Sequence, residues 1–210
     1  RLVEIVRQHV PPVRLESPVA TDASADARPP ARTRSMLKIE DGCDHHCTYC
    51  IVPAARGPAR SVPVDQVLTT VRRRVADGYK EVVLTGVALG SYGRDLGQPG
   101  ALTALVRAIL DETTLSRLRL SSIEPEYVDP ALFALWADPR FCRHLHLPLQ
   151  SGCDATLRRM GRRYRSTDFA ALVAQARAAA SDVAITTDII AGFPGETDEE
   201  FAESLAFAES

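Results

Sequence analysis

Three cysteines stand close together in one short stretch of this chain: Cys43, Cys47 and Cys50, with Tyr49 directly before the last. Their spacing, C-x3-C-x2-C, lets a single loop wrap an iron–sulfur cubane, with one thiolate on each of three irons. The fourth iron then has no protein ligand, so a small molecule can bind it and receive an electron. The spacing therefore predicts a [4Fe–4S] cluster on these three cysteines, with one open corner.

Zinc is the alternative metal for this motif, because His45 or His46 could complete a Cys3His set of ligands. Adjacent histidines between two ligand cysteines would need an awkward loop to reach the same ion, which favours the cluster. Free thiols are the remaining alternative. The other two of the five cysteines, Cys142 and Cys153, lack metal-ligand spacing, and we expect them to be structural.

The composition is that of an ordinary globular domain, with 45% hydrophobic and 25% charged residues among 210. A formal net charge of −2 gives no overall basic field, so any contact with RNA must use a local patch. The odd number of cysteines does not suggest a secreted disulfide framework, and we expect a cytoplasmic location. The sequence has no apolar run of membrane-spanning length and no signal-peptide pattern, so we expect no membrane partner.

The amino-terminal residues 1–34 are predicted to be a linker and the remnant of a preceding domain. The segment from Pro11 to Ser35 is rich in Pro, Ala, Asp and Arg, and it cannot bury enough apolar surface to fold alone. A helix from Leu2 to His9 is expected before it. Residues 35–210 are predicted to form the main domain, truncated at its carboxyl terminus. Both ends look cut, so we expect an excised part of a larger protein.

Short apolar strands alternate with amphipathic helices over the main domain. Gly78 is expected to end the first helix and Ser61 to cap it, whereas Ser166 or Thr167 should cap the fourth. The segment Thr197–Glu200 forms a capping box for the last helix. Strands are predicted over residues 36–39, 81–85, 118–122, 144–147 and 183–190, and helices over residues 63–77, 101–111, 129–137, 166–180 and from 197 onward.

This rhythm predicts an α/β fold of five βα units with a parallel sheet and right-handed crossovers. The sheet could curve into a partial (β/α) barrel or stay open as a doubly wound sheet. Each strand ends in a polar or glycine-rich segment, as expected where one site is assembled from the carboxyl ends of barrel strands. No G-x-G-x-x-G turn follows the first strand, which disfavours an open-sheet nucleotide-binding protein. A partial barrel completed by a missing strand is therefore favoured.

Several segments, taken together, resemble the radical S-adenosylmethionine (SAM) methylthiotransferases. They span most of the chain: Leu37–Cys43, Arg56–Ser61, Leu147–Gly152, Arg158–Tyr164 and Asp188–Thr197. The resemblance implies a partial (β/α) barrel of the radical SAM type, with five of about six βα units present. It also implies that the chain is a transferase that uses a [4Fe–4S] cluster and SAM.

Two strand ends favour one branch of that family. The segments Leu84–Gly93 and Leu120–Pro125 resemble the enzymes that methylthiolate N6-threonylcarbamoyl-adenosine in tRNA. The alternatives within the family are the branch acting on isopentenyl-adenosine in tRNA and the branch acting on a ribosomal-protein aspartate. A zinc-stabilised binding module is the alternative of a different class.

The resemblance implies a mechanism that starts at the open iron. SAM would chelate that iron, and an electron from the cluster would release a 5′-deoxyadenosyl radical, after which a methylthio group is delivered to C2 of the purine. The difficult chemistry belongs to the cofactor, while the protein positions it and excludes water. The catalytic and metal-binding residues are then Cys43, Cys47 and Cys50.

The resemblance also implies residues that bind the cofactor. Tyr49 would lie near the adenine, and Gly86 would approach the methionyl amine. Glu124 and Gln150 end two strands where SAM or substrate is expected, and Arg162 would clamp the methionyl carboxylate or contact an RNA phosphate. For each, a tight turn, loop packing or a solvated helix flank is the plainer alternative. The residues expected to bracket the adenine are Gly192, Phe193 and Pro194.

Further partners are implied by the complete family enzymes. These carry an amino-terminal domain with a second [4Fe–4S] cluster and a small carboxy-terminal β domain that binds RNA. We therefore expect tRNA to bind mainly through missing domains, and an electron-donor protein of unknown identity to reduce the cluster. The segment alone is expected to bind and cleave SAM without completing methylthiolation.

Overall fold

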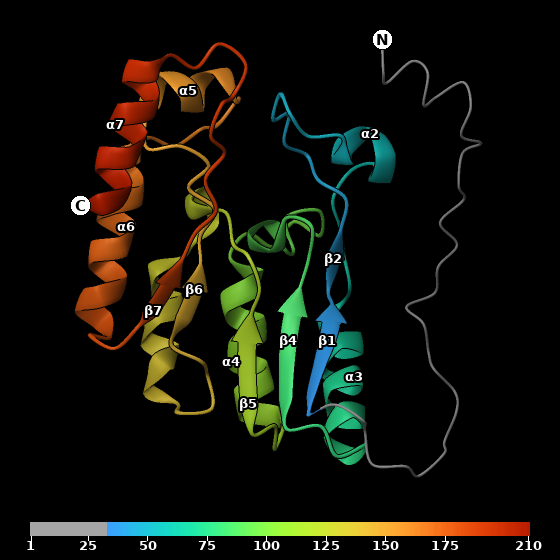
Figure 1. Ribbon diagram of the computed structural model, residues 1–210. Coiled ribbons are helices and arrows are strands. Elements are labelled where there is room, and N and C mark those ends of the chain that lie inside the picture. Colours follow the sequence, from blue (N-terminus) through green and yellow to red (C-terminus); the bar gives the residue numbers. More distant parts are fainter. Residues whose placement is uncertain (1–32) are drawn as a thin grey trace.

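The computed structural model describes residues 33–210 of the chain. The helix predicted from Leu2 to His9 lies outside these residues, as does the predicted linker over residues 1–34 except for its last two residues. Of those two, Arg34 already belongs to the first strand, β1 (Arg34–Lys38). Figure 1 shows the described elements in chain order, from blue to red.

Five parallel strands carry the fold. Strands β1, β4 (Glu81–Thr85) and β5 (Arg117–Leu120) form one hydrogen-bonded sheet in the order β1-β4-β5. Strands β6 (His144–His146) and β7 (Ala184–Thr186) form a second parallel pair. The arrows of β1, β4 and β5 point the same way, toward the segment that holds the cysteines (Figure 1).

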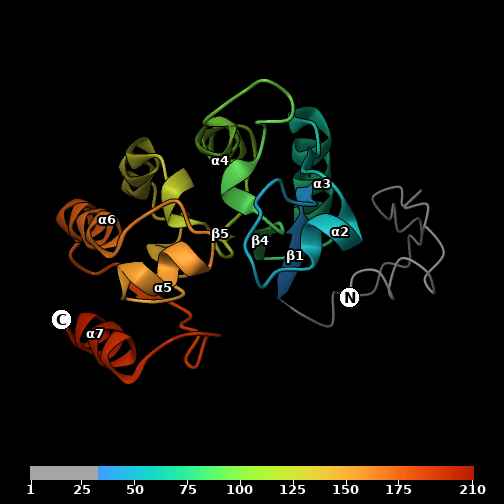
Figure 2. The ribbon, with the colours of Figure 1, turned by 90° about the horizontal axis from the view of Figure 1, so that it is seen from above.

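The two sheets are continuous where β5 meets β6. The Ile123 amide donates a hydrogen bond to the His146 carbonyl at 3.0 Å, and Ser122 forms a parallel bridge with His146. The strand order is therefore β1-β4-β5-β6-β7. Seen from above, the strands follow an arc rather than a plane (Figure 2). This curvature confirms the predicted α/β partial barrel and rules out the flat alternative.

Helices cover the outer side of the arc (Figure 2). The predicted amphipathic pattern is clear in the helices before and after β4 and weak in those that follow β5. Within residues 33–210, no helix is both long and apolar enough to pass through a bilayer. The helices that connect successive strands are α3 (Val64–Ala76), α4 (Ala101–Glu112), the 3-10 helix η3 (Pro130–Ala137) and α6 (Ser166–Ala179), and α7 (Asp198–Glu209) follows β7.

The hydrophobic core lies between the strands and these helices. Leu84, Leu118 and Leu145 are almost completely buried on the helix-facing side of β4, β5 and β6. Leu105 and Ile109 of α4 are fully buried in the same cluster. Each such side chain stabilises the fold by about 2 kcal/mol relative to its exposed state. The core therefore fixes the strands and leaves their carboxyl ends free for chemistry.

Two predicted helix caps are wrong. Ser61 does not cap α3, because its hydroxyl donates to Asp95 Oδ1 at 2.6 Å and the helix begins after Pro63. Neither Ser166 nor Thr167 caps α6; Asp168 accepts the Arg165 amide instead. A distant side chain thus takes the Ser61 hydroxyl, whereas at α6 a carboxyl of the helix itself accepts the Arg165 amide.

Two further elements differ from the prediction, one in helix type and one in strand length. The segment from Pro130 to Ala137 is a 3-10 helix, whereas an ordinary helix is the expected form for residues 129–137. β7 covers only Ala184–Thr186 of the predicted 183–190, because pairing with the preceding segment continues only through a bridge between Gln150 and Ile189. The capping box at Thr197, by contrast, is present with Glu200.

Short elements that the sequence pattern did not indicate frame the cysteine segment. Strands β2 (Glu40–Asp41) and β3 (Arg60–Ser61) pair antiparallel, and helix α2 (Val52–Arg56) lies between them. Two further short elements are helix α5 (Asp154–Arg159) and the 3-10 helix η1 (Leu89–Ser91). They are too short to show a period, yet they position the candidate site.

Candidate functional site

The cysteine loop, defined here as residues 43–50, leaves β2 and enters α2 at the carboxyl end of β1. Its start is fixed by Gly42, whose φ of 83° favours glycine and whose added Cβ would lie 2.0 Å from the Pro58 carbonyl oxygen. The Cys43 amide donates to the Gly57 carbonyl at 3.1 Å. The base of the loop is therefore closed by backbone contacts.

The far side of the cysteine loop is attached to the end of α5. The Thr48 amide donates to the Met160 carbonyl at 3.0 Å, and the Thr48 hydroxyl donates to the Arg159 carbonyl at 2.9 Å. Gly161 packs against the loop so closely that an added Cβ would lie 3.1 Å from the His46 carbonyl oxygen. Two distant parts of the chain thus hold the loop, which is preorganised before any metal binds.

Two of the three thiols, Cys43 and Cys47, are partly buried, whereas Cys50 is exposed. Burial raises the pKa of Cys43 to about 11, and the Glu124 carboxyl adds to the rise. Burial also raises the pKa of Cys47, although Arg162 opposes this. The His45 amide donates to Cys43 Sγ at 3.4 Å, a contact that favours a thiolate. The thiols of Cys43 and Cys47 therefore stay protonated until a metal replaces the proton, so metal binding releases protons here.

The donor set fits an iron–sulfur cluster better than a single zinc ion. Within residues 33–210, no three His, Cys, Asp or Glu side chains converge as ligands of one ion must. In a cubane each thiolate binds its own iron, so the thiols need not converge. His45, one candidate for the fourth zinc ligand, is buried against the Tyr127 ring with centroids 5.2 Å apart.

The remaining cysteines lie away from the cysteine loop. Cys142 is buried near the amino-terminal end of the sheet, where its sulfur accepts a hydrogen bond from Arg117 Nε at 3.1 Å. Cys153 is buried at the start of α5. Neither extends the ligand set, which leaves one corner of a cubane open.

Glu124 follows β5 and lies beside the cysteine loop. Its Oε2 accepts the Gly90 amide at 3.3 Å, and burial raises its pKa to about 7. Gly90 is a glycine for a steric reason, because an added Cβ would lie 2.6 Å from Tyr127 Cβ. Glu124 is thus brought to the cysteines, as expected from its place at a strand end.

The two aromatic residues predicted near the adenine face each other. The rings of Tyr49 and Phe193 meet edge to face, with centroids 6.1 Å apart. Tyr49 is 40% exposed, so its ring borders an open space. Gly192 and Pro194 flank Phe193 and are exposed, and an added Cβ at Gly192 would meet nothing within 4 Å. The Gly192 amide donates to Glu196 Oε2, which shapes this turn.

Arg162 points into the same region from the segment after α5. Its Nε is buried and has no hydrogen-bond partner among the described residues, and its guanidinium lies 5.8 Å from the Tyr164 ring centroid. Burial acts to lower the pKa of Arg162, but Tyr164, Tyr49 and Cys47 together raise it. A half-buried guanidinium whose Nε has no partner among the described residues is suited to an anionic group.

Gln150 follows β6 in a strained conformation. With a φ of 65°, it is the only non-glycine residue with positive φ in residues 33–210. Backbone hydrogen bonds to Asp188 and Ile190 hold it there, at 2.9 Å each. Strain of this kind costs about 1 kcal/mol or more and is often found at functional sites. The structure gives no contact between Gln150 and the cysteine loop.

Sequence reasoning missed Glu40, which is buried on β2 just before the cysteine loop and contacts the turn that contains Gly86. The only available signal was an acidic residue directly after an apolar strand, and the neighbouring Asp41 carries the same signal. Asp41 is instead held by Lys38 and Arg56. The Arg56 side chain is thus paired with a carboxyl of the protein itself.

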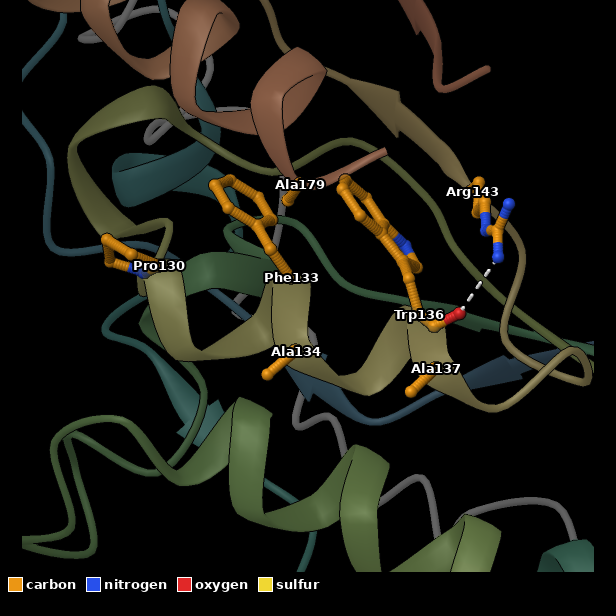
Figure 3. A pocket seen from close by; sticks show the side chains of 7 residues that line it. All are labelled: Pro130, Phe133, Ala134, Trp136, Ala137, Arg143 and Ala179. Atoms are coloured by element: carbon orange, nitrogen blue, oxygen red, sulfur yellow. Dashed lines mark hydrogen bonds between the residues drawn. The ribbon is translucent and has the colours of Figure 1, made fainter. Parts of the chain in front are cut away.

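A cavity of about 480 Å³ lies away from this site, between η3 and α6. Figure 3 shows the stacked rings of Phe133 and Trp136 along it, with Arg143 donating to the Trp136 carbonyl. Arg143 also pairs with Asp182, so no titratable group in the cavity is left for chemistry. The carboxyl ends of the strands remain the candidate active site.

Comparison with known proteins matches this geometry. The family model described as the radical SAM superfamily matches residues 37–208. A threonylcarbamoyladenosine tRNA methylthiotransferase MtaB of Thermotoga maritima is 47% identical over 85% of this chain and 41% of its own length. A tRNA-2-methylthio-N(6)-dimethylallyladenosine synthase of Parafrankia sp. is 45% identical over 87% of this chain and 37% of its own. The chain thus spans about two fifths of these relatives.

Solved structures support the fold alone. The radical S-adenosylmethionine methyltransferase TsrM from Kitasatospora setae superposes with a TM-score of 0.67 at 21% identity, over 83% of this chain and 34% of that one. The cobalamin-dependent S-adenosylmethionine radical enzyme OxsB superposes with a TM-score of 0.65 at 15% identity, over 83% of this chain and 26% of that one. Both agree with the partial barrel.

Proposed function

Because the chain belongs to the radical SAM superfamily, whose members use a [4Fe–4S] cluster and SAM, we propose that it is the catalytic core of a tRNA methylthiotransferase. The observation that carries this proposal is the cysteine loop with three thiols at the carboxyl end of a partial barrel, in a chain whose relatives are such enzymes. Cys43, Cys47 and Cys50 are the proposed ligands of the cluster.

When bound, the cluster supplies an electron to SAM and so provides the radical that activates the substrate. The chain itself holds and surrounds these groups. Tyr49 and Phe193 offer ring edges and faces to the adenine, and Arg162 offers its free donor to the methionyl carboxylate. The exposed backbone at Gly192 and Pro194 borders the same space. These residues orient the cofactor and exclude water, which is the protein's share of the chemistry.

Gly86, Glu124 and Gln150 complete the proposed cofactor site from three neighbouring strand ends. Gly86 brings backbone close to the methionyl amine, while Glu124 and Gln150 provide side-chain groups to SAM or substrate. The raised pKa of Glu124, due mainly to burial, lets its carboxyl donate as well as accept a proton near neutral pH. Perturbed carboxyls of this kind gather at functional sites.

The proposed substrate is N6-threonylcarbamoyl-adenosine in tRNA, methylthiolated at C2. Support comes from the segments Leu84–Gly93 and Leu120–Pro125, and from the relative of 47% identity that carries this name. Dimethylallyl-adenosine is the second candidate, because a relative of 45% identity is named for it. A tRNA substrate would place the enzyme in the cytoplasm.

The complete reaction is proposed to need more than this chain. A second [4Fe–4S] cluster in an amino-terminal domain, an RNA-binding domain and an electron-donor protein are the proposed additional parts. The proposal is consistent with the chain spanning only 41% and 37% of its two relatives' lengths.

Mass spectrometry of tRNA nucleosides tests the substrate. Cells that lack the gene should lose the methylthio group from threonylcarbamoyl-adenosine and keep it on dimethylallyl-adenosine. The intact gene should restore the product, and a gene with Cys47→Ala should not. Loss from dimethylallyl-adenosine instead would establish the second candidate. Unchanged tRNA with an altered ribosomal-protein aspartate would overturn the proposal.

A further inference from the structure

We propose that Glu40 is a positioning residue, whose buried carboxyl locks the turn after β4 to the strand that enters the cysteine loop. Glu40 fits beside this turn because Gly86 has no side chain. This inference rests on the family and the cysteine loop, and it does not depend on which nucleoside is modified.

The contact between Glu40 and the turn is direct. Glu40 is only 1% exposed, and its Oε2 accepts the Ala88 amide at 2.8 Å. A Cβ added at Gly86 would lie 2.7 Å from Glu40 Oε2 and 3.1 Å from Glu40 Cβ. It would also lie 3.2 Å from Leu89 Cα. Any side chain at position 86 therefore collides with the glutamate that holds the turn.

Gly86 is not required by its backbone conformation. Nine glycines in the described part of the chain have positive φ, and Gly86 is not one of them. Any L-residue can adopt its backbone angles, so only the space occupied by Glu40 and the adjoining turn explains the glycine. Glu40 and Gly86 are thus a matched pair across two strand ends.

The same turn is held a second time at its other end. Glu124 Oε2 accepts the Gly90 amide at 3.3 Å, while Glu40 Oε2 accepts the Ala88 amide. Two carboxyls on either side therefore fix the backbone between Gly86 and Gly90 through its own N–H groups. Glu40 also precedes Cys43 by only three residues, so one side chain relates the turn to the cysteine loop.

Glu40 performs this task without a cation. Its Oε1 is buried with no hydrogen-bond partner among residues 33–210, and burial raises its pKa to about 7. A neutral side chain of the same shape can therefore replace it. In a Glu40→Gln variant, the new amide oxygen would accept the Ala88 amide, and the new NH2 group would occupy the place of Oε1.

The test measures SAM affinity of the iron-reconstituted chain under anaerobic conditions, together with iron content and the electron paramagnetic resonance (EPR) change on adding SAM. Glu40→Gln should bind SAM within about twofold of the parent. Glu40→Ala should bind about tenfold more weakly, the size of one hydrogen bond, while keeping its iron. Glu112→Ala is the matched control, since Glu112 is exposed on α4 in a pair with Arg72.

Gly86→Ala should weaken SAM binding at least as much as Glu40→Ala. The double variant Glu40→Ala, Gly86→Ala should bind no more weakly than Gly86→Ala alone, because removing the glutamate makes room for the new methyl group. If Gly86→Ala fails to fold, the Glu40 variants still decide the proposal. Unchanged SAM affinity in Glu40→Ala would overturn the proposal. So would a Glu40→Gln variant that binds SAM as weakly as Glu40→Ala, or a double variant whose loss of SAM affinity is the product of the two single losses.

Discussion

Glu81 and Glu40 are both buried glutamates near the central strands, but they lie at opposite ends of the sheet. Glu81, at the amino-terminal end, is surrounded by Arg119 at 2.8 Å, Arg34 at 3.0 Å and Arg117 at 3.6 Å. These cations hold the pKa of Glu81 below its usual value, although burial opposes them. At the carboxyl-terminal end, burial raises the pKa of Glu40 to about 7.

The difference separates the amino-terminal end of the sheet, which stabilises the fold, from the carboxyl-terminal end, called here the working end, which is suited to binding ligands. Glu40 and Glu124 form no ion pair within residues 33–210, and both have a pKa of about 7. At the amino-terminal end, Glu81 forms ion pairs with arginines of the same sheet, and these pairs stabilise the fold. The carboxyl-terminal end keeps unsatisfied polar groups beside three thiols, and groups of that kind are typical of sites prepared for ligands.

The largest difference between the ends should appear on removing a cysteine from each. Cys47→Ala should abolish the cluster, because a cubane left with two protein thiolates is lost. Cys142→Ala, near the amino-terminal end, should keep it. Iron and sulfide analysis after anaerobic reconstitution, with the absorbance spectrum, measures both. A cluster that survives Cys47→Ala but not Cys142→Ala would reverse the assignment of the ends.

The pH dependence of stability should reveal the unpaired carboxyl. The pKa of Glu40 is raised when folded, so its contribution is fully present below about pH 4.5 and is lost as pH rises through about 7. Glu40→Gln should therefore match the parent at pH 4.5 and exceed its stability at pH 8 by roughly 1–3 kcal/mol. Urea unfolding at both pH values measures this, and equal stability at pH 8 would contradict it.

The contribution of Glu81 to stability should depend on pH in the opposite direction. Its pKa is lowered when folded, so its contribution is present above the unfolded pKa of about 4.5 and is lost as pH falls through the lower folded value. Glu81→Gln should lose roughly 1–2 kcal/mol at pH 8, because three arginines lose their partner. The loss should shrink below pH 4. Since Glu81 lies far from the cysteine loop, SAM affinity should stay unchanged.

The smallest effect is expected at the aromatic pair. Phe193→Ala should weaken SAM binding about threefold to tenfold, the range of one aromatic contact. Phe201→Ala removes a phenylalanine that is 44% exposed on α7, and it should leave the affinity unchanged. Equilibrium dialysis with labelled SAM compares the two variants. Equal losses in both would remove Phe193 from the cofactor site.

Features that repeat along the chain could be predicted from the sequence. The strand at residues 81–85 was located to the residue, because a continuous apolar run lies between a helix-ending Gly78 and the glycine at 86. The cysteine loop was placed at a strand end by the same reasoning. These features depend on local composition and period, which a sequence displays directly.

Features that depend on distant contacts could not be predicted. The helices α2 and α5 span only five and six residues, too few for a periodic pattern, and the ends of the cysteine loop hold them in place. The local sequence predicts Ser61 as a helix cap, but in the fold its hydroxyl donates to Asp95 instead. The role of Glu40 depends on Ala88, 48 residues away along the chain. In each case the fold, rather than local sequence, decides the partner.

The most direct test of the working end is the EPR spectrum of the reduced, iron-reconstituted chain before and after addition of SAM. We predict a [4Fe–4S] signal that depends on Cys43, Cys47 and Cys50 and that changes when SAM is added, because SAM binds the iron without a protein ligand. One tightly bound zinc without such a signal, or a signal that SAM leaves unchanged, would contradict the open corner on which the whole site depends.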